Sequence, residues 1–261
     1  MKLTILGTSA AYSGKNEGCP AYLISSKGKH YLLDAGPGCV SLLQNYIRIT
    51  DINAIFLSHL HADHVSDIYT LRYAVYIAQH EGLMQQHMPI YMPKSPRKTY
   101  RFIKETIKKE FTITEITEKL KLHLNGMDVS FKKTVHPVNT FAVRFEAFEN
   151  DSSDGFSGNK TGEKTIVYTS DTGFFEELSS FSSGSHILLA EATFQNSDKK
   201  LENLGHMTAE RAGELATKAG AEKLILTHII PPYDKNISLK EAKRSFAKDI
   251  VIAERGQEFT L

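Results

Sequence analysis

Three histidines and an aspartate lie within six residues of one another, in the stretch Ser58-His59-Leu60-His61-Ala62-Asp63-His64. The stretch directly follows the apolar run 54–57, which is typical of a buried strand, so we expect the polar cluster at the C-terminal end of that strand. His59 and His61 can point the same way from an extended backbone, whereas Asp63 and His64 fall on the turn into the next helix. The spacing therefore predicts two pairs of ligands for two neighbouring metal ions.

Imidazole nitrogens and carboxylate oxygens without a thiolate favour Zn²⁺, with Mn²⁺ or iron as competitors, and exclude the cysteine-rich sites of structural zinc. In a simpler interpretation, Asp63 only caps a helix that begins near Val65, and the histidines lie on the surface. Four ligand-type residues in six positions argue against that interpretation.

Other strands must supply the remaining ligands. Runs 21–24 and 30–33 predict a hairpin whose second strand ends at Asp34, although an ordinary turn aspartate explains that residue equally well. The dipeptide Asn125-Gly126 predicts another hairpin, and the alternating run 129–135 leads into His136 at a strand end. His136 precedes a proline and fits an ordinary loop as well, but its strand-end position favours a metal ligand.

The second half of the sequence repeats this rhythm. Three apolar runs, 165–169, 186–189 and 223–227, each lead into one acidic or imidazole group, namely Asp171, Glu191 and His228. Because α/β sheets build their sites at the C-terminal ends of strands, we expect these groups to line one site. The Asp-, Ser- and Gly-rich segment 150–162 is expected to form a mobile surface loop.

Composition sets broader limits. The sequence has 261 residues, of which 41% are hydrophobic, and has a formal net charge of +1. We expect one cytoplasmic domain, 1–261, with two similar halves of roughly 1–135 and 136–261, no membrane segment and no DNA partner. Two cysteines, Cys19 and Cys39, imply no disulfide framework.

One local basic patch stands out. Arg97, Arg101, Lys104 and Lys108 follow one face of a predicted helix. A charged helix face is more often merely solvated than in contact with nucleic acid, so the solvated face is the preferred interpretation and contact with nucleic acid the alternative.

The motif His-x-His-x-Asp-His resembles the signature of the metallo-β-lactamase superfamily. The resemblance implies an α/β fold, the αββα sandwich of two mixed β-sheets with helices on the outer faces. It implies that two divalent ions, Zn²⁺ or alternatively Mn²⁺, are held by His59, His61 and His136 on one side and by Asp63, His64 and His228 on the other, with Asp171 bridging both. It also implies that Asp34 hydrogen-bonds near the metal-binding histidines, and that the protein is a homodimer.

Within the superfamily, the sequence looks most like the ribonuclease Z branch. Ala190-Glu191-Ala192-Thr193 is similar to that branch's His-Glu-Ala-Thr motif, and Gly205-His206-Met207-Thr208 to its His-Ser-Thr loop. Ala190 and Met207 depart from the motifs. The segment between His136 and Asp171 is too short for the long arm with which ribonuclease Z grips tRNA.

We therefore expect a metal-dependent phosphodiester hydrolase that acts on nucleotide or RNA diesters through metal-bound hydroxide. Asp63 is the expected proton acceptor, and His206, oriented by Glu191, is the expected acid that protonates the leaving group. Two divalent ions, two carboxylates and a hydroxide leave one positive charge, which matches a monoanionic diester. Without the arm, small or cyclic diesters and short single strands are the expected substrates.

Alternatives remain. A lactonase or thioesterase would use the same metals but would not need the His206 acid, and a true tRNA 3′-processing endoribonuclease would need another grip on tRNA. A diiron flavoprotein would normally place glutamate at His61 and carry a flavin domain. A non-catalytic binding module is disfavoured because all the ligand positions are filled.

Overall fold

The computed structural model describes residues 1–148, 150–151 and 160–261, and these divide into two compact units. The N-terminal unit contains residues 2–116 and 254–260, and the C-terminal unit contains residues 117–253 with the two terminal residues. The boundary at 116/117 lies ahead of the position near 135 that the sequence rhythm indicated. That the whole chain counts as one domain stays a prediction.

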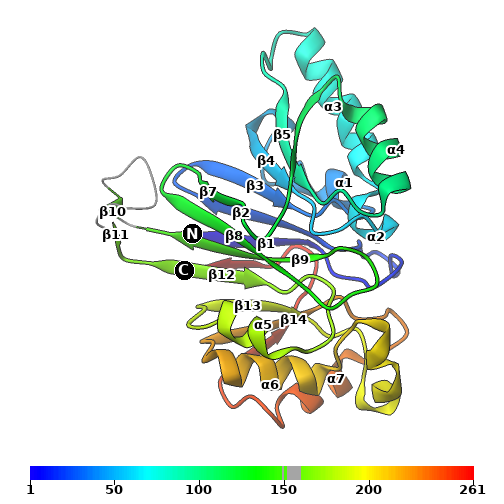
Figure 1. Cartoon of the computed structure of the whole chain (residues 1–261), viewed down its shortest axis with the longest axis vertical. Coiled ribbons are helices and arrows are strands. Elements are labelled where there is room, and N and C mark those ends of the chain that lie inside the picture. Colours follow the sequence, from blue (N-terminus) through cyan, green and yellow to red (C-terminus); the bar gives the residue numbers. More distant parts are fainter. Residues whose placement is uncertain (149, 152–159) are drawn as a thin grey trace. The chain divides into compact units, whose positions relative to one another are not determined.

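The N-terminal unit is built on a mixed sheet of seven strands in the order β16-β1-β2-β3-β4-β5-β6. Strands β1 to β5 of this sheet are labelled in Figure 1. Its strands are β1 (Lys2–Gly7), β2 (Ala21–Ser26), β3 (Lys29–Leu33), β4 (Ile52–Phe56), β5 (Met88–Met92), β6 (Phe111–Glu115) and β16 (Glu258–Thr260). From β3 to β6 neighbouring strands are parallel, whereas β1 pairs antiparallel with β2 and β16. The last strand of the chain thus belongs to the first sheet.

The helices of this unit are α1 (Cys39–Leu43), the 3₁₀ turn η1 (Ile49–Asp51), α2 (Ala62–Val65), α3 (Ile68–His80) and α4 (Arg97–Ile107). Alternate strand residues and the apolar stripes of the helices form one core. Leu32 and Ile55 of the sheet belong to it together with Val75 of α3 and Ile103 of α4. Burial of these stripes fixes the helices against one face of the sheet.

The helix that the sequence predicts after the turn of Asp63 and His64 is in fact two helices, and both residues lie in the first of them, α2. The helix is interrupted between α2 and α3, and Asp67 lies at the interruption. Its carboxylate accepts hydrogen bonds from the backbone N–H groups of Gly38 and Val40, at 3.0 Å each. This tertiary contact ties α3 to the loop that opens α1, and helical periodicity alone does not reveal it.

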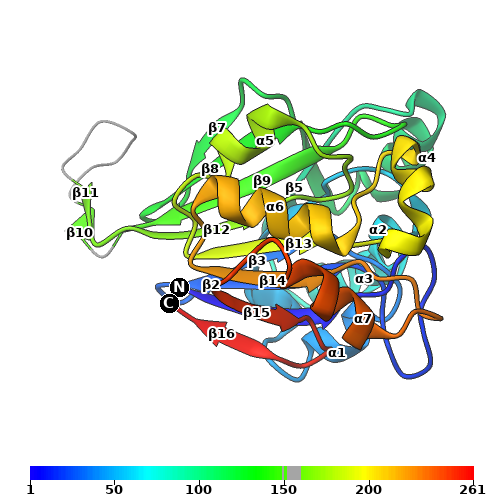
Figure 2. The same ribbon diagram turned by 90° about the horizontal axis from the view of Figure 1, so that it is seen from below.

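The C-terminal unit has its own mixed sheet of seven strands, in the order β15-β14-β13-β12-β9-β8-β7 (Figure 2). The strands are β7 (Lys121–His123), β8 (Met127–Lys133), β9 (Phe141–Ala147), β12 (Lys164–Tyr168), β13 (Ile187–Glu191), β14 (Lys223–Thr227) and β15 (Asp249–Ile252). The first three pair antiparallel, whereas β12 to β15 are parallel. The hairpin at Asn125-Gly126 therefore belongs to this sheet.

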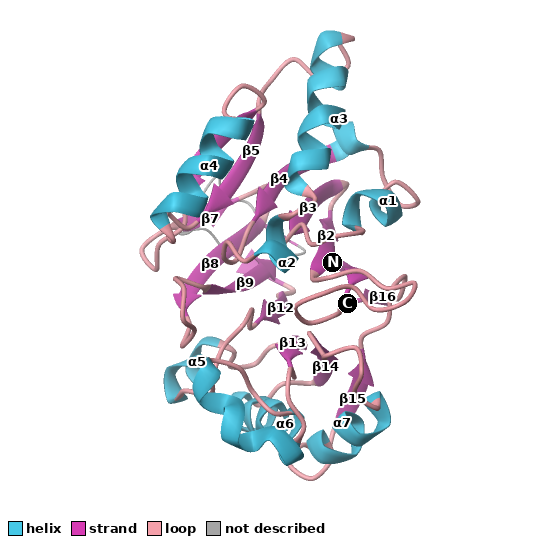
Figure 3. Ribbon diagram, turned by 90° about the vertical axis from the view of Figure 1, so that its right-hand side faces the viewer, coloured by secondary structure: helices cyan, strands magenta, loops and turns pink. Residues whose placement is uncertain are grey.

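Helices α5 (Glu176–Phe181), α6 (Ala209–Ala219) and α7 (Lys235–Ala242) cover one side of β12–β15 (Figure 3), and a 3₁₀ segment, η2 (Asn196–Leu204), precedes α6. The loop expected over 150–162 lies outside the described residues except at its ends, where β10 (Asn150–Asp151) pairs with β11 (Lys160–Thr161). In the described part of the chain, no helix is both long and apolar enough to cross a bilayer.

Gly213 of α6 offers a test of the packing between α6 and α7. A Cβ atom at this position would lie 2.6 Å from the carbonyl oxygen of Ala242. Replacing glycine by alanine inside a helix normally stabilises a protein by up to about 1 kcal/mol. Here we expect Gly213→Ala to lower the free energy of unfolding by about 1–3 kcal/mol, because α7 must move. Denaturant unfolding decides the sign, and a stabilised variant would contradict the packing.

Candidate metal centre

In the N-terminal unit, two parallel strand ends bring Asp34 beside the histidine cluster. Leu33 at the end of β3 is in register with Phe56 at the end of β4, so the residues that follow lie side by side. Asp34 adopts a left-handed backbone, with φ of 56°. Its carboxylate accepts hydrogen bonds from the backbone N–H of Ser58 at 2.7 Å and from the Ser58 hydroxyl at 2.8 Å. The same carboxylate lies 2.8 Å from Nδ1 of His64.

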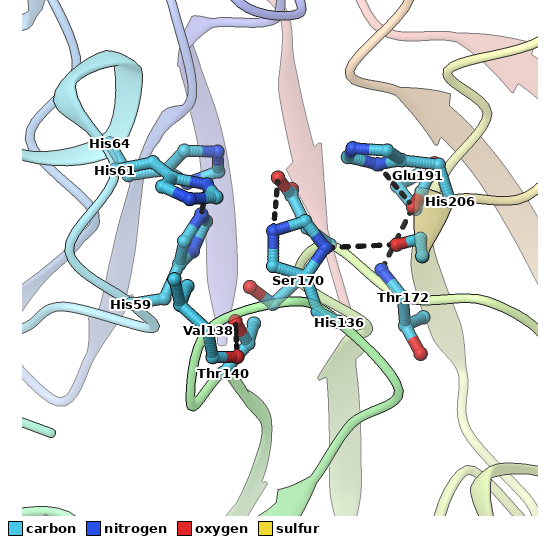
Figure 4. A network of polar contacts seen from close by, with 12 residues as sticks. His59, His61, His64, His136, Val138, Thr140, Ser170, Thr172, Glu191 and His206 are labelled. Carbon is cyan, nitrogen blue, oxygen red and sulfur yellow. Dashed lines mark hydrogen bonds and ion pairs between the residues drawn. The ribbon is translucent and has the colours of Figure 1, made fainter. Parts of the chain in front are cut away.

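His59 and His61 face each other through one nitrogen each. Nε2 of His59 lies 3.1 Å from Nδ1 of His61 (Figure 4). Since the Ser58 hydroxyl donates to Asp34, we assign a proton to Nδ1 of His59, which donates to the Ser58 oxygen at 3.1 Å. The lone pair of Nε2 is then directed toward His61, as a metal ligand requires.

His64 is oriented in the same way for the second pair. Its Nδ1 donates to Asp34, which leaves the lone pair on Nε2, 3.6 Å from Oδ2 of Asp63. Oδ2 of Asp63 also accepts a hydrogen bond from the backbone N–H of Ala11 at 3.1 Å. Sequence reasoning missed Ala11, because a loop alanine carries no chemical signal of its own.

The loop after Asp34 needs a glycine to approach α2. A Cβ atom at Gly36 would lie 2.2 Å from the carbonyl oxygen of Asp63 and 2.8 Å from a backbone atom of Cys19. The backbone N–H of Ala35 donates to the carbonyl of His64 at 2.7 Å.

Burial raises the pKa of the Cys19 thiol, and it raises the pKa of the Cys39 thiol well above its usual range. Both thiols are therefore protonated near neutral pH, which agrees with a ligand set without thiolate.

In the C-terminal unit, Asp171 faces two imidazoles with its two oxygens. Its Oδ2 lies 4.0 Å from Nε2 of His136, and its Oδ1 lies 3.5 Å from Nε2 of His228. The loop of His136 is held to the loop of Asp171, because the Thr134 hydroxyl donates to the Asp171 carbonyl at 2.9 Å. This arrangement suits a carboxylate that bridges two ions.

Both imidazoles are fixed through Nδ1. Nδ1 of His136 donates to the carbonyl of Gly205 at 2.9 Å, and Nδ1 of His228 lies 2.8 Å from the hydroxyl of Thr193. In the neutral rings, each Nε2 then presents a lone pair toward a carboxylate oxygen of Asp171. Electron-pair donors that face each other repel, and a cation between them turns this repulsion into attraction. The donor set thus fits divalent cations.

His206 lies against a buried carboxylate beside these residues. Nδ1 of His206 is 3.0 Å from Oε1 of Glu191, whose side chain is 0% exposed (Figure 4). Glu191 also accepts hydrogen bonds from the backbone N–H groups of Thr172 at 2.9 Å and Thr193 at 3.0 Å, and from the Thr193 hydroxyl at 2.7 Å. Four contacts therefore hold the carboxylate. Thr193 belongs to the motif quoted above, but the sequence did not predict that Thr193 and Thr172 hold Glu191.

The ring of His206 reaches the metal-ligand candidates. Donor atoms of Asp171, His206 and His228 lie within 4.8 Å of one another, and the rings of His206 and His228 stack with centroids 5.6 Å apart. Ala190 and Met207, the two departures from the family motifs, are fully buried in the apolar core of the unit. Their apolar side chains match that environment.

The structure thus assembles the predicted residues in two sets. The N-terminal unit brings together Asp34, His59, His61, Asp63 and His64, and the C-terminal unit brings together His136, Asp171, Glu191, His206 and His228. One motif supplies four residues of the first set, and Asp34 joins them from the neighbouring strand end. The second set combines residues from several strand ends.

Comparisons with known proteins identify the family and its fold. Residues 29–229 match the family described as the beta-lactamase superfamily domain. The chain is 30% identical to the probable metallo-hydrolase YhfI of Bacillus subtilis (strain 168), over 98% of each chain. A crystal structure of YhfI aligns with a TM-score of 0.87 at 29% identity and covers 99% of this chain and 98% of that one. The chain is also 25% identical to ribonuclease Z of Archaeoglobus fulgidus, over 96% of this chain and 94% of that protein.

These likenesses confirm the expected metallo-β-lactamase fold class and the resemblance to ribonuclease Z. The two mixed sheets with their helices are the architecture that the family motif implied.

Thr193 provides a test of the tautomer assignment. Its hydroxyl donates to Glu191 and accepts from Nδ1 of His228, so it orients a metal-ligand candidate and the partner of His206 together. We expect Thr193→Val to weaken divalent-metal binding about 10–100-fold, because such supporting contacts typically contribute that much. Thr193→Ser, which keeps the hydroxyl, serves as the control. Equal metal affinities in the two variants, measured by competition with a chelator, would contradict the assignment.

Proposed function

We propose that this chain, which belongs to the metallo-β-lactamase superfamily and is a metal-dependent hydrolase, cleaves phosphodiester bonds in nucleotides or short RNA. One observation carries the proposal. A histidine, His206, is held by the buried carboxylate of Glu191 and lies beside the metal-ligand candidates Asp171 and His228. A proton donor at that position is needed when the leaving group is a poorly leaving alkoxide.

Two divalent ions, Zn²⁺ or alternatively Mn²⁺, are proposed to occupy the site. His59, His61 and His136 would hold one ion, Asp63, His64 and His228 would hold the other, and Asp171 would bridge them. When bound, such ions lower the pKa of a water molecule and stabilise negative charge on phosphate oxygens. The tautomers fixed by Asp34, Ser58, Thr193 and Gly205 support this assignment, since each directs a histidine lone pair away from its supporting contact.

Two side chains of the chain then carry out the two proton transfers. Asp63 accepts the proton of the attacking water, and the backbone N–H of Ala11 holds its carboxylate in place. His206 gives a proton to the departing oxygen. Glu191 accepts a hydrogen bond from Nδ1 of His206 and favours the charged ring, as a nearby anion does.

The substrate class rests on the leaving group. An aryl ester, a lactone or a thioester does not need the His206 acid, whereas a ribose alkoxide does. The similarity of this chain to the Archaeoglobus fulgidus protein named ribonuclease Z supports RNA as a substrate class. The alignment to it runs over 296 residues, more than the 261 of this chain, so that protein carries segments which this chain lacks. This supports small or single-stranded diesters over folded tRNA.

Several expectations from the sequence stay predictions: the choice of zinc, the cytoplasmic location, the homodimer and the absence of a DNA partner. Two competing functions remain, that of a lactonase or thioesterase and that of a true tRNA 3′-processing enzyme. The experiments below distinguish them from our proposal.

The bridging role of Asp171 can be tested by metal content. Purified protein should hold close to two divalent ions per chain, and Asp171→Ala should lose more than one of them, because both carboxylate oxygens face histidines. Asp249→Ala, at an exposed carboxylate of β15, is the matched control and should keep both ions. Retention of two ions by Asp171→Ala would rule out the bridge.

The acid role of His206 can be tested by the choice of leaving group. General acid catalysis contributes roughly 10²–10⁴-fold. We expect His206→Ala to lose about that much activity on a nucleoside diester, while it keeps most of its activity on bis(4-nitrophenyl) phosphate, whose leaving group departs without a proton. Glu191→Gln should show the same split more weakly.

Metal content provides the control for this experiment. Because His206 also lies near Asp171 and His228, it could serve as a ligand instead of an acid. Loss of a metal ion from His206→Ala, or equal losses on the two substrates, would overturn the acid role. High activity of the wild-type protein on a lactone or thioester, with none on either diester, would favour the competing class.

A further inference from the structure

A cavity of about 430 Å³ lies on the outer side of α4 in the N-terminal unit. It is lined mainly by cationic side chains, with one aromatic ring and one carboxylate: Lys94, Arg97, Tyr100, Arg101, Lys104 and Glu105. Three of the four cations follow one helix face at spacings of four and three residues. The basic stripe that the sequence predicted thus borders a hollow, although Lys108 at its end is not part of the lining.

The acidic groups nearby do not balance these charges. Lys94 forms an ion pair with Glu115 at 2.7 Å, and Glu105 pairs with Lys108. Among the described residues, no ion pair is found for Arg97, Arg101 or Lys104, and all three are exposed. Like charges on one helix face repel one another by a few tenths of a kcal/mol per pair.

The position of the cations along the helix adds to this imbalance. The first turn of α4 contains no acidic residue, and Arg97 is its first residue. The N-terminal end of a helix carries partial positive charge, so basic side chains there are unfavourable unless an anion offsets them. An anion in the cavity would be attracted both by the side chains and by the helix end.

Aromatic rings flank the basic residues. Tyr100 lines the cavity, and Phe102, which follows Arg101, is 65% exposed with its ring centroid 5.9 Å from that of Tyr69 on α3. Phe102 thus presents an exposed ring next to cations for which no ion pair is found among the described residues. Cations that follow a backbone, together with rings on which bases stack, are the features of single-stranded nucleic acid sites.

We propose that this basic cavity binds single-stranded RNA, with phosphates on Arg97, Arg101 and Lys104 and a base stacked on Phe102. The site is separate from the residues that carry the hydrolytic chemistry. Binding itself does not require that chemistry. That the bound strand is also a substrate rests on the proposed function.

The test measures binding of a fluorescent single-stranded RNA of twelve nucleotides by anisotropy, at several salt concentrations and with EDTA to prevent cleavage. The logarithm of affinity should fall with the logarithm of salt with a slope of about −2 to −3, because each phosphate contact contributes about −0.7. Arg101→Glu with Lys104→Glu should weaken binding at least 10-fold and make the slope shallower by about 1 to 1.5.

A matched control changes the same charge elsewhere. Lys119→Glu with Lys121→Glu alters two exposed lysines of the C-terminal unit and should leave the affinity within about 2-fold. Phe102→Ala should weaken binding about 5-fold or more without changing the salt slope, because stacking is not ionic. Phe102→Leu keeps apolar bulk and separates stacking from folding.

Besides unchanged RNA binding in the variants of the cavity, three outcomes would overturn the site. These are no RNA binding by the wild-type protein near physiological salt, equal weakening by the two charge-reversal pairs, and binding of inorganic polyphosphate or anionic vesicles at the cavity without binding of RNA. Hydrolysis of bis(4-nitrophenyl) phosphate is measured alongside and should be unchanged in all four variants. Absence of that hydrolysis in the wild-type protein would reject the proposed function alone, and unchanged RNA binding in the variants would reject the cavity alone.

Discussion

The buried carboxylate of Glu191 is the contact on which the chemistry of the C-terminal unit depends. It stands at the end of β13 and receives hydrogen bonds from Thr172, Thr193 and His206. A carboxylate removed from water is costly unless such donors surround it. Through Thr172 it holds the loop of Asp171, and through Thr193 it reaches His228. One charge thus fixes the loop that carries the bridging candidate, the tautomer of a ligand candidate and the orientation of the proposed acid.

The same design recurs in the N-terminal unit with a different carboxylate. Asp34 follows β3, and its carboxylate accepts hydrogen bonds from Ser58 and His64, as that of Glu191 does from its partners. Asp34 and His228 both adopt left-handed backbones directly after a parallel strand. Such conformations cost free energy for residues other than glycine and persist where the surroundings enforce them. Here they turn side chains out of the sheet at the strand end, where a site can form.

Local sequence patterns were enough to place the strands that precede the candidate site residues, but they did not predict β5, β6, β15 or β16. In each case the polar residue directly follows the apolar run, so its position at the strand end can be predicted without knowledge of distant contacts. The parts that could not be predicted depend on tertiary contacts. Asp67 lies where the helical pattern is interrupted, and its partners are the backbone N–H groups of Gly38 and Val40 at the start of α1. Thr193 was noted only as part of the Ala-Glu-Ala-Thr motif, and its contacts with Glu191 and His228 could not be predicted. Ala11 escaped notice because a backbone N–H leaves no trace in residue type or spacing.

The central claim is that Asp171 bridges two ions while His206 stays outside their coordination. Anomalous diffraction from crystals loaded with zinc or manganese tests this directly, because it locates each ion without assuming its ligands. We expect two peaks roughly 3.5–4 Å apart, one at each carboxylate oxygen of Asp171, with both nitrogens of His206 beyond bonding distance. A single peak, or a peak within about 2.1 Å of a His206 nitrogen, would contradict the account.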